Sequence, residues 1–120
     1  IINIGSILSE RFSTNENPAY GASKAACKSL VRDLSLLLSH KNINVNSISP
    51  ALLYRNKKSL DFLLERLQRH PSNCQPTSYS DIYKLVQFIC CSGIQSLRGQ
   101  DITLDHGLES IESFDLLNYK

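Results

Sequence analysis

Apolar residues recur along the chain with two different spacings, and the shorter spacing marks strands. The run Ile1 to Ile4 ends at Gly5 and Ser6 and predicts a buried strand. The stretch Ile43 to Pro50 alternates apolar and polar residues and predicts a second strand, which Pro50 ends. Asp101 to Asp105, directly after Gly99 and Gln100, predicts a third.

The segments between these strands follow helical spacing. A long helix is predicted from about Pro18 to His40, with Asn17 as its cap and Pro18 in its first turn. Lys28, Arg32, Asp33 and Ser35 fall mainly outside its apolar stripe, which contains Ala22, Ala26, Leu30, Leu34 and Leu37 or Leu38.

Two further helices are predicted after the second strand. One runs from Asn56 to about Gln68. The other is capped by Thr77 or Ser80 and ended by Gly93, with Ile82, Leu85, Val86 and Ile89 facing inward. The stretches 9–17 and 69–77 are polar or contain proline and predict loops.

Strand, helix, strand, two helices and strand form the rhythm of a parallel sheet with helical crossovers, so the predicted class is α/β. Such sheets bind ligands at the carboxyl ends of their strands. Ser6, Pro50 and Asp105 follow or end the three strands. Tyr20 and Lys24, in the first turns of the long helix, are expected at the same edge.

Tyr20 and Lys24 are four residues apart, so on a helix their side chains project from one face. A cation about 4 Å from a phenol, in an effective dielectric of about 20, is worth roughly 4 kcal/mol. The ammonium is therefore expected to make the phenol a stronger acid, able to exchange protons near neutral pH. A tyrosine ring in the core beside a solvated lysine has the same spacing, so the pair alone leaves both interpretations open.

Four segments in this order resemble the carboxyl-terminal half of a short-chain dehydrogenase/reductase. They are Ile2 to Ser6, Tyr20 to Ala26, Ile43 to Pro50 and Gly99 to Asp105, and the similarity extends over residues 1 to about 107. The resemblance implies a Rossmann-like parallel sheet, the second half of a doubly wound NAD(P)-binding domain.

The resemblance also implies hydride transfer between NAD or NADP and a carbonyl or alcohol substrate. Ser6 would hydrogen-bond the substrate oxygen, and Tyr20 would give it a proton or take one from it. Lys24 would bind the ribose hydroxyls of the cofactor. On the cofactor side it implies Tyr20, Lys24, Pro50, Ala51, Leu53 and Arg55, with a lid over about residues 53–70.

Three positions depart from the family pattern. Ala51 stands where glycine is usual, Arg55 where threonine is frequent, and His106 where the family often has glycine. They motivate an alternative, a non-catalytic relative that keeps the scaffold for binding or regulation.

No glycine-rich turn between a strand and a helix occurs in the 120 residues, although that turn binds the cofactor pyrophosphate in such folds. The chain is therefore expected to be a piece of a longer protein and to be inactive alone. The residue that selects NAD or NADP belongs to the segment not seen here.

Composition excludes some other classes of function. A net charge of +2, with basic and acidic residues interspersed, does not favour nucleic acid, and no apolar stretch is long enough to cross a bilayer. Cys27, Cys74, Cys90 and Cys91 lack metal-site spacing, so no metal site is expected, and reduced thiols in the cytoplasm are predicted. The long helix is expected to join copies of the chain into a homodimer or homotetramer.

Overall fold

The computed structural model describes residues 1–10, 18–67 and 75–108. The strands are β1 (Ile2–Ile4), β2 (Asn46–Pro50) and β3 (Asp101–Leu104). The helices are α1 (Pro18–Leu37), α2 (Lys57–Leu67) and α3 (Tyr79–Cys91), with one-turn 3-10 helices η1 (Ile7–Ser9) and η2 (Ser39–Lys41). The order of predicted elements is confirmed.

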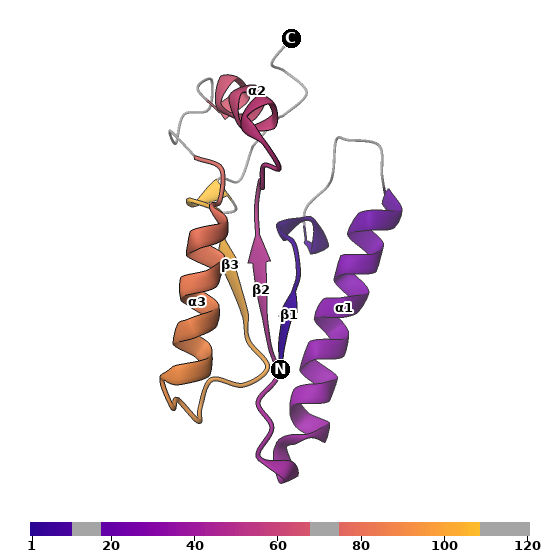
Figure 1. The fold of residues 1–120 in the computed structure, drawn as a ribbon. Coiled ribbons are helices and arrows are strands. Elements are labelled where there is room, and N and C mark those ends of the chain that lie inside the picture. The colour runs from indigo at the N-terminus through magenta and orange to yellow at the C-terminus, as the bar shows by residue number, and fades with distance from the viewer. Residues whose placement is uncertain (11–17, 68–74, 109–120) are drawn as a thin grey trace.

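The three strands form one parallel sheet in the order β1-β2-β3, which confirms the predicted α/β class. Ile48 in the central strand pairs with Ile4 on one side and with Ile102 on the other. Helices α1 and α3 flank the sheet on opposite sides, and α2 lies beyond the strands' carboxyl ends (Figure 1). Both crossovers step across the sheet in the same direction, but their helices lie on opposite faces of it. The two crossovers therefore have opposite hands, and only one of them follows the right-handed rule.

Strand β2 is buried along its whole length, including its polar side chains. Alternation ordinarily marks a strand with one solvated face, but here both faces are covered by helices. The Asn46 amide donates to the Leu97 carbonyl (2.8 Å) and its oxygen accepts from the Gln100 N–H (3.0 Å). Asn46 thus fixes the turn that leads into β3, and both its side-chain nitrogen and its side-chain oxygen have a hydrogen-bond partner despite their burial.

Helix α1 buries only part of its predicted apolar stripe: Leu34 and Leu38 are partly buried, but the other members are exposed. Val31 and Ser35 are buried, whereas Leu30 is 54% exposed and Leu37 64% exposed. Ala22 and Ala26 are exposed as well. An apolar outward face therefore runs along α1 through Ala22, Ala26, Leu30 and Leu37.

The ends of the later helices are set by side-chain hydrogen bonds. The cap of α3 is Ser78, not Thr77 or Ser80, and its Oγ accepts from the Asp81 N–H (3.0 Å). Thr77 instead is buried and donates from its hydroxyl to the Leu104 carbonyl (2.7 Å). Asn56 caps α2 by accepting from the Ser59 N–H (2.9 Å).

The end of α3 and its inward-facing residues agree with the sequence prediction. Helix α3 ends at Cys91 and Gly93 has a φ of +69°, as its position at the end of that helix predicted. The residues expected to face the sheet are its partly buried ones, Ile82, Leu85, Val86 and Ile89. The predicted cap Asn17, and the loops over 11–17 and 69–74, lie outside the described residues.

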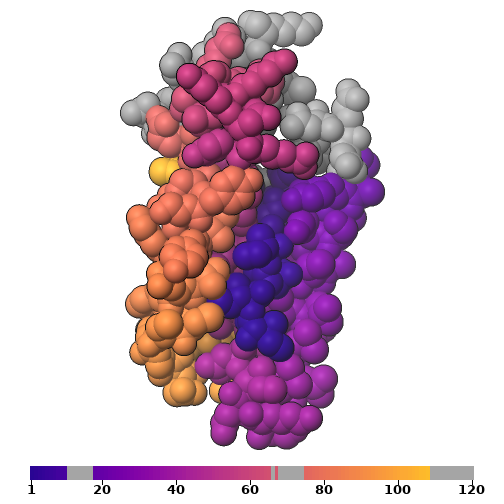
Figure 2. All heavy atoms as spheres, in the orientation of Figure 1, coloured from indigo at the N-terminus to yellow at the C-terminus, as the bar shows by residue number. Residues whose placement is uncertain are grey.

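Strand β1 forms one edge of the sheet. It pairs with β2 alone in the described parts of the chain, and Ile1 and Ile4 are 64% and 44% exposed. Its atoms reach the surface between α1 and α3 (Figure 2). Since parallel strands are normally covered on both sides, this apolar edge is suited to pair with another parallel strand.

Candidate active site

The predicted site residues gather at the carboxyl ends of the strands. Ser6 follows β1, Pro50 is the last residue of β2, and Asp105 follows β3. Because the strands are parallel, these three positions share one edge of the sheet.

Ser6 is buried and fixed by its backbone. The preceding Gly5 N–H donates to the Ile48 carbonyl (2.8 Å), which extends the sheet to the residue before Ser6. Ser6 is the N-cap of η1, and its Oγ accepts from the Leu8 N–H (3.2 Å). A hydroxyl that accepts in one bond can still donate in another, as the predicted contact to a substrate oxygen requires.

Tyr20 and Lys24 lie together at the start of α1. The Lys24 Nζ lies 5.7 Å from the centroid of the Tyr20 ring, within the range of a cation–π contact. The same ammonium donates to the Ile4 carbonyl at the end of β1 (2.9 Å). Lys24 therefore contacts Tyr20 directly and also contacts β1, the strand that Ser6 follows. That all three side chains share one pocket stays a prediction.

A small residue allows this close approach. A Cβ atom on Gly21 would lie 3.0 Å from the Leu8 carbonyl oxygen of η1, tighter than ordinary van der Waals contact. The first turns of α1 therefore lie directly against η1, the turn that Ser6 caps.

The predicted cofactor-side residues follow β2. Pro50 is buried, Ala51 and Leu53 are partly buried, and Arg55 is exposed. The Ala51 N–H donates to the Leu104 carbonyl (3.0 Å), so this backbone continues the pairing of β2 with β3.

Contacts anchor the residues at the start of the segment predicted as a lid. The Thr77 N–H donates to the Leu52 carbonyl (2.8 Å), and the rings of Tyr54 and Tyr79 meet edge to face at 6.3 Å. Leu67, the last residue of α2, packs in a buried apolar cluster with Ile7 and Leu108. Helix α2 therefore rests on the residue next to Ser6, and residues 68–70 of the predicted lid lie outside the described ranges.

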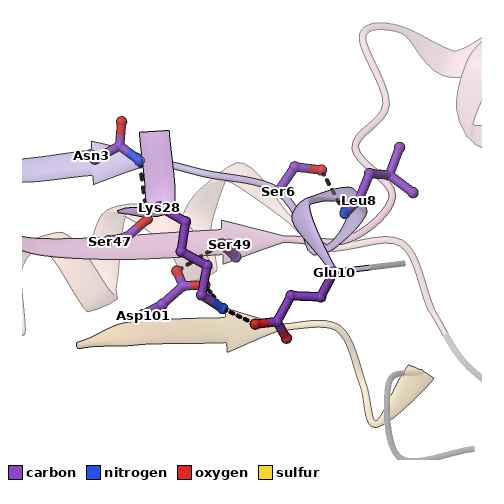
Figure 3. Close-up of polar contacts among 8 residues, drawn as sticks. All are labelled: Asn3, Ser6, Leu8, Glu10, Lys28, Ser47, Ser49 and Asp101. Atoms are coloured by element: carbon purple, nitrogen blue, oxygen red, sulfur yellow. Dashed lines mark hydrogen bonds and ion pairs between the residues drawn. The ribbon is translucent and has the colours of Figure 1, made fainter. Parts of the chain in front are cut away.

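A charged cluster lies under α1 and was not predicted from the sequence. Lys28 forms ion pairs with Asp101 of β3 (2.8 Å) and with Glu10, and the Ser49 hydroxyl donates to Asp101 (2.7 Å) (Figure 3). The Asp101 side chain is only 10% exposed.

Each charged group in this cluster favours ionisation of the other. Burial disfavours the ammonium, but hydrogen bonds to Asp101 and Glu10 outweigh it and raise the pKa of Lys28 above its ordinary value. Burial likewise opposes ionisation of the carboxyl, yet hydrogen bonds from Lys28, Ser49 and Ser47 hold the pKa of Asp101 below its usual range. The pair is therefore charged across neutral pH.

The polar face continues across the sheet toward β1. The Asn3 amide donates to the Ser47 hydroxyl (3.1 Å). A Cβ atom on Gly5 would lie 2.5 Å from Ser49 Oγ and 2.9 Å from Ser47 Oγ, so only glycine leaves room for these hydroxyls. The face of the sheet under α1 is thus polar, and Lys28 supplies its positive charge.

Comparisons with known proteins agree on one family. A family model described as "Enoyl-(Acyl carrier protein) reductase" matches residues 1–109. The 7alpha-hydroxysteroid dehydrogenase of Escherichia coli strain K12 is 31% identical over 110 residues, which are 89% of this chain and 43% of that protein. The chain belongs to the short-chain dehydrogenase/reductase family.

Solved structures of this family share the fold. The short-chain dehydrogenase of Leptospira borgpetersenii with bound NAD⁺ matches 89% of this chain with a TM-score of 0.75 and 26% identity. Acetoin dehydrogenase from Enterobacter cloacae matches 92% with a TM-score of 0.76 and 25% identity. The chain covers 43% of each of these two chains, and so spans less than half the length of the relatives it matches.

The contact of Lys28 with Asp101 was not predicted from the sequence, because Lys28 falls outside the apolar stripe of the predicted helix and no partner was assigned to it. A signal was available: Ser47 and Ser49 are two residues apart and share one face of a central strand, which therefore needs polar partners. Across the described ranges, no three His, Cys, Asp or Glu residues are grouped to hold a metal ion.

Proposed function

We propose that the complete protein is an NAD(P)-dependent oxidoreductase that transfers a hydride between a nicotinamide cofactor and a carbonyl or alcohol. The observation that carries the proposal is the Lys24 ammonium, which lies over the Tyr20 ring and on the carbonyl that ends β1. In this arrangement the Tyr20 phenol lies beside a fixed positive charge at the ligand-binding edge of a parallel sheet, which supports a role in proton transfer.

Three side chains have distinct roles in this proposal. Ser6 donates a hydrogen bond to the substrate oxygen. The Tyr20 phenol gives its proton to that oxygen in reduction, and in oxidation the Tyr20 phenolate takes a proton from the alcohol. The Lys24 ammonium stabilises the phenolate that remains after the proton has left.

The residues present fit the cofactor that the family uses. When bound, the cofactor supplies or accepts the hydride. Lys24 and Tyr20 would hold its ribose, since an ammonium and a phenol at the carboxyl end of β1 offer donors for hydroxyl groups. The backbone around Pro50, Ala51 and Leu53, with Arg55, would line the nicotinamide side.

The test of the proposal uses the complete protein. Titration with NADH and with NADPH, followed by cofactor fluorescence, is expected to give saturable binding of at least one of them. Reduction of a panel of small ketones and aldehydes, followed by loss of absorbance of the reduced cofactor, is expected to show turnover. Absence of binding by both cofactors would contradict the proposal.

The same experiment distinguishes the second candidate, a non-catalytic scaffold. That candidate is favoured by Ala51, whose methyl group stands at the carboxyl end of β2 where the family usually has glycine. Cofactor binding without turnover of any carbonyl in the panel would support the scaffold function.

The outward face of α1 supports a homodimer or homotetramer. Ala22, Ala26, Leu30 and Leu37 expose apolar surface along a single 20-residue helix. Small residues on such a face allow two helices to approach closely, and a two-fold interface would use the same face of both copies. We therefore place a contact between copies on this face.

Replacing Leu30 by glutamate is expected to weaken that association. The change buries an unpaired carboxylate twice in a two-fold interface, at a cost of several kcal/mol, about a hundredfold or more in dissociation constant. Sedimentation velocity of the complete protein checks this. The control Phe62→Glu makes the same kind of change on the exposed side of α2 and should leave the sedimentation coefficient unchanged. A monomeric wild-type protein would contradict the placement.

The cytoplasm is the compartment we propose. Cys27, Cys90 and Cys91 are free thiols, which suits a reducing environment. Separately, a search of the described residues finds no helix with the length and apolar character needed to cross a membrane.

A further inference from the structure

The turn that begins at Ser6 is held at both ends and in the middle. Its start is tied to the sheet, where the Gly5 N–H donates to the Ile48 carbonyl (2.8 Å). Its middle lies against Gly21 of α1 at the Leu8 carbonyl. Its end is Glu10, the C-cap of η1, whose carboxylate is paired with Lys28.

Hydrogen bonds within the turn connect Glu10 to Ser6, so that a shift of one residue affects the other. The Glu10 N–H donates to the Ile7 carbonyl (3.1 Å), the Ser9 N–H to the Ser6 carbonyl (3.0 Å), and the Leu8 N–H to Ser6 Oγ (3.2 Å). Five consecutive residues are therefore connected by three hydrogen bonds. A displacement of Glu10 would strain the bond that orients the Ser6 hydroxyl.

Lys28 connects this turn to the rest of the proposed site. It lies four residues after Lys24 and eight after Tyr20, so the three side chains share one face of α1. Its ammonium is simultaneously bound to Asp101, which the Ser49 hydroxyl holds on the central part of the sheet. Figure 3 shows Lys28 between Asp101 and Glu10, with the turn from Ser6 to Glu10 beside them.

We propose that Lys28, through Glu10 and Asp101, is a positioning residue that sets the Ser6 turn relative to the Tyr20 and Lys24 face of α1. The inference rests on the proposed function for its catalytic consequence, but the mechanical link between Glu10 and Ser6 does not depend on it. Lys28 touches neither substrate nor cofactor in this role. It acts by holding Glu10.

The mechanical link is tested by Glu10→Gln in the complete protein. This change removes the turn-side charge, keeps the Lys28–Asp101 pair, and alters an exposed side chain, so the fold is expected to survive. Hydrogen exchange measured by mass spectrometry should become about three- to fivefold faster at the Leu8, Ser9 and Glu10 amides, which corresponds to a local weakening of about 0.7 to 1 kcal/mol, the upper range for an ion pair with an exposed partner. The control Asp33→Asn removes an exposed carboxylate about 20 Å along α1 from Tyr20 and should leave these amides unchanged. Unchanged exchange in Glu10→Gln would overturn the proposal.

The catalytic consequence is tested by a double-mutant cycle in kcat. Glu10→Gln alone is expected to lower kcat about tenfold, because misplacement of a catalytic group costs rate. In the Ser6→Ala background the same change should lower kcat less than about twofold, because no hydroxyl remains to be positioned. A merely structural role would give equal losses in both backgrounds, and that result would overturn the catalytic consequence, namely that Glu10 acts on turnover through the Ser6 hydroxyl.

The two proposals fail in different ways. If Tyr20→Phe keeps full turnover while Glu10→Gln accelerates exchange of the turn, the assigned role of Tyr20 is wrong and the positioning role of Lys28 stands. If Tyr20→Phe abolishes turnover while Glu10→Gln leaves the exchange of the turn unchanged, the role of Tyr20 stands and the positioning role of Lys28 is wrong.

Discussion

Replacing Tyr20 by phenylalanine is expected to lower kcat of the complete protein by about 10²- to 10⁴-fold, the range that general acid–base catalysis contributes. The change removes a single hydroxyl. The ring that remains can still lie beside the Lys24 ammonium, 5.7 Å from it in the present structure. Lys24 should therefore keep its hydrogen bond to the Ile4 carbonyl, and cofactor binding should change little.

The measurement is kcat with saturating cofactor, together with the thermal unfolding midpoint. Because Tyr20 is 42% exposed, loss of its hydroxyl should leave that midpoint nearly unchanged. The matched control is Tyr83→Phe, the same chemical change at an exposed position of α3, with kcat expected at the wild-type value. A kcat for Tyr20→Phe within about twofold of wild type would remove Tyr20 from the proton transfer, since even modest acid–base catalysis exceeds that factor.

The architecture could be predicted from the sequence because each element carries a local signal. These signals each span only a few residues: the apolar run from Ile1 to Ile4, the helical spacing after Pro18, and Gly99 before the last strand. Their order then predicts a parallel sheet with helical crossovers, although the hand of the one crossover that departs from the right-handed rule could not be predicted. The edge at which Ser6, Tyr20 and Lys24 lie follows from the parallel direction of the strands and from the positions of these residues just after β1 and at the start of α1.

The orientation of α1 could not be predicted in the same way. The stripe through Ala22, Ala26 and Leu30 satisfies the rule that apolar residues face the core, yet it lies outward. Which face of α1 is buried depends on the side chains of the sheet that lie under it, and these include the polar Ser47 and Ser49. Helix periodicity identifies faces but does not say which partner each one meets.

The cap of α3 shows a similar limit. The sequence predicted Thr77 or Ser80 as the cap, but Ser78 between them is equally suited to capping, so local sequence does not choose among the three. Tertiary contacts decide, because the Thr77 hydroxyl is used by the Leu104 carbonyl and Ser78 is left at the helix start. Where neighbouring side chains could each cap a helix, a hydrogen-bond partner from a distant part of the chain decides which one does.

Replacing Lys28 by methionine is expected to destabilise the complete protein by about 3 kcal/mol, the lower part of the range for breaking a buried ion pair. Methionine keeps most of the stem but leaves the Asp101 carboxylate, 10% exposed, without its cation. Lys28→Arg, which keeps the charge, is the conservative control and should lose much less. Chemical denaturation at pH 7 measures the free energy of unfolding of each variant.

The pH dependence identifies charge as the cause. The pKa of Asp101 is lowered in the folded wild type, so the pair contributes fully above the unfolded value of about 4 and is lost as the pH falls through the lower folded value. The pKa of Lys28 is raised, so its contribution persists below about 10.4 and is lost only as the pH rises through the higher folded value. In Lys28→Met the unpaired carboxyl is relieved by protonation, so the difference from wild type should be constant between about pH 6 and 9 and shrink below about pH 4.

A second substitution separates charge from packing. In the double variant Lys28→Met with Asp101→Asn, no buried charge is left without a partner, since the remaining Glu10 carboxylate is exposed, and a large part of the lost stability should return. The Ser49 hydroxyl can still donate to the amide oxygen of asparagine at that position. If the double variant were no more stable than Lys28→Met, and the difference from wild type were the same at pH 3 and pH 7, the loss would come from packing of the lysine stem. The ion pair would then not be what holds α1 to β3.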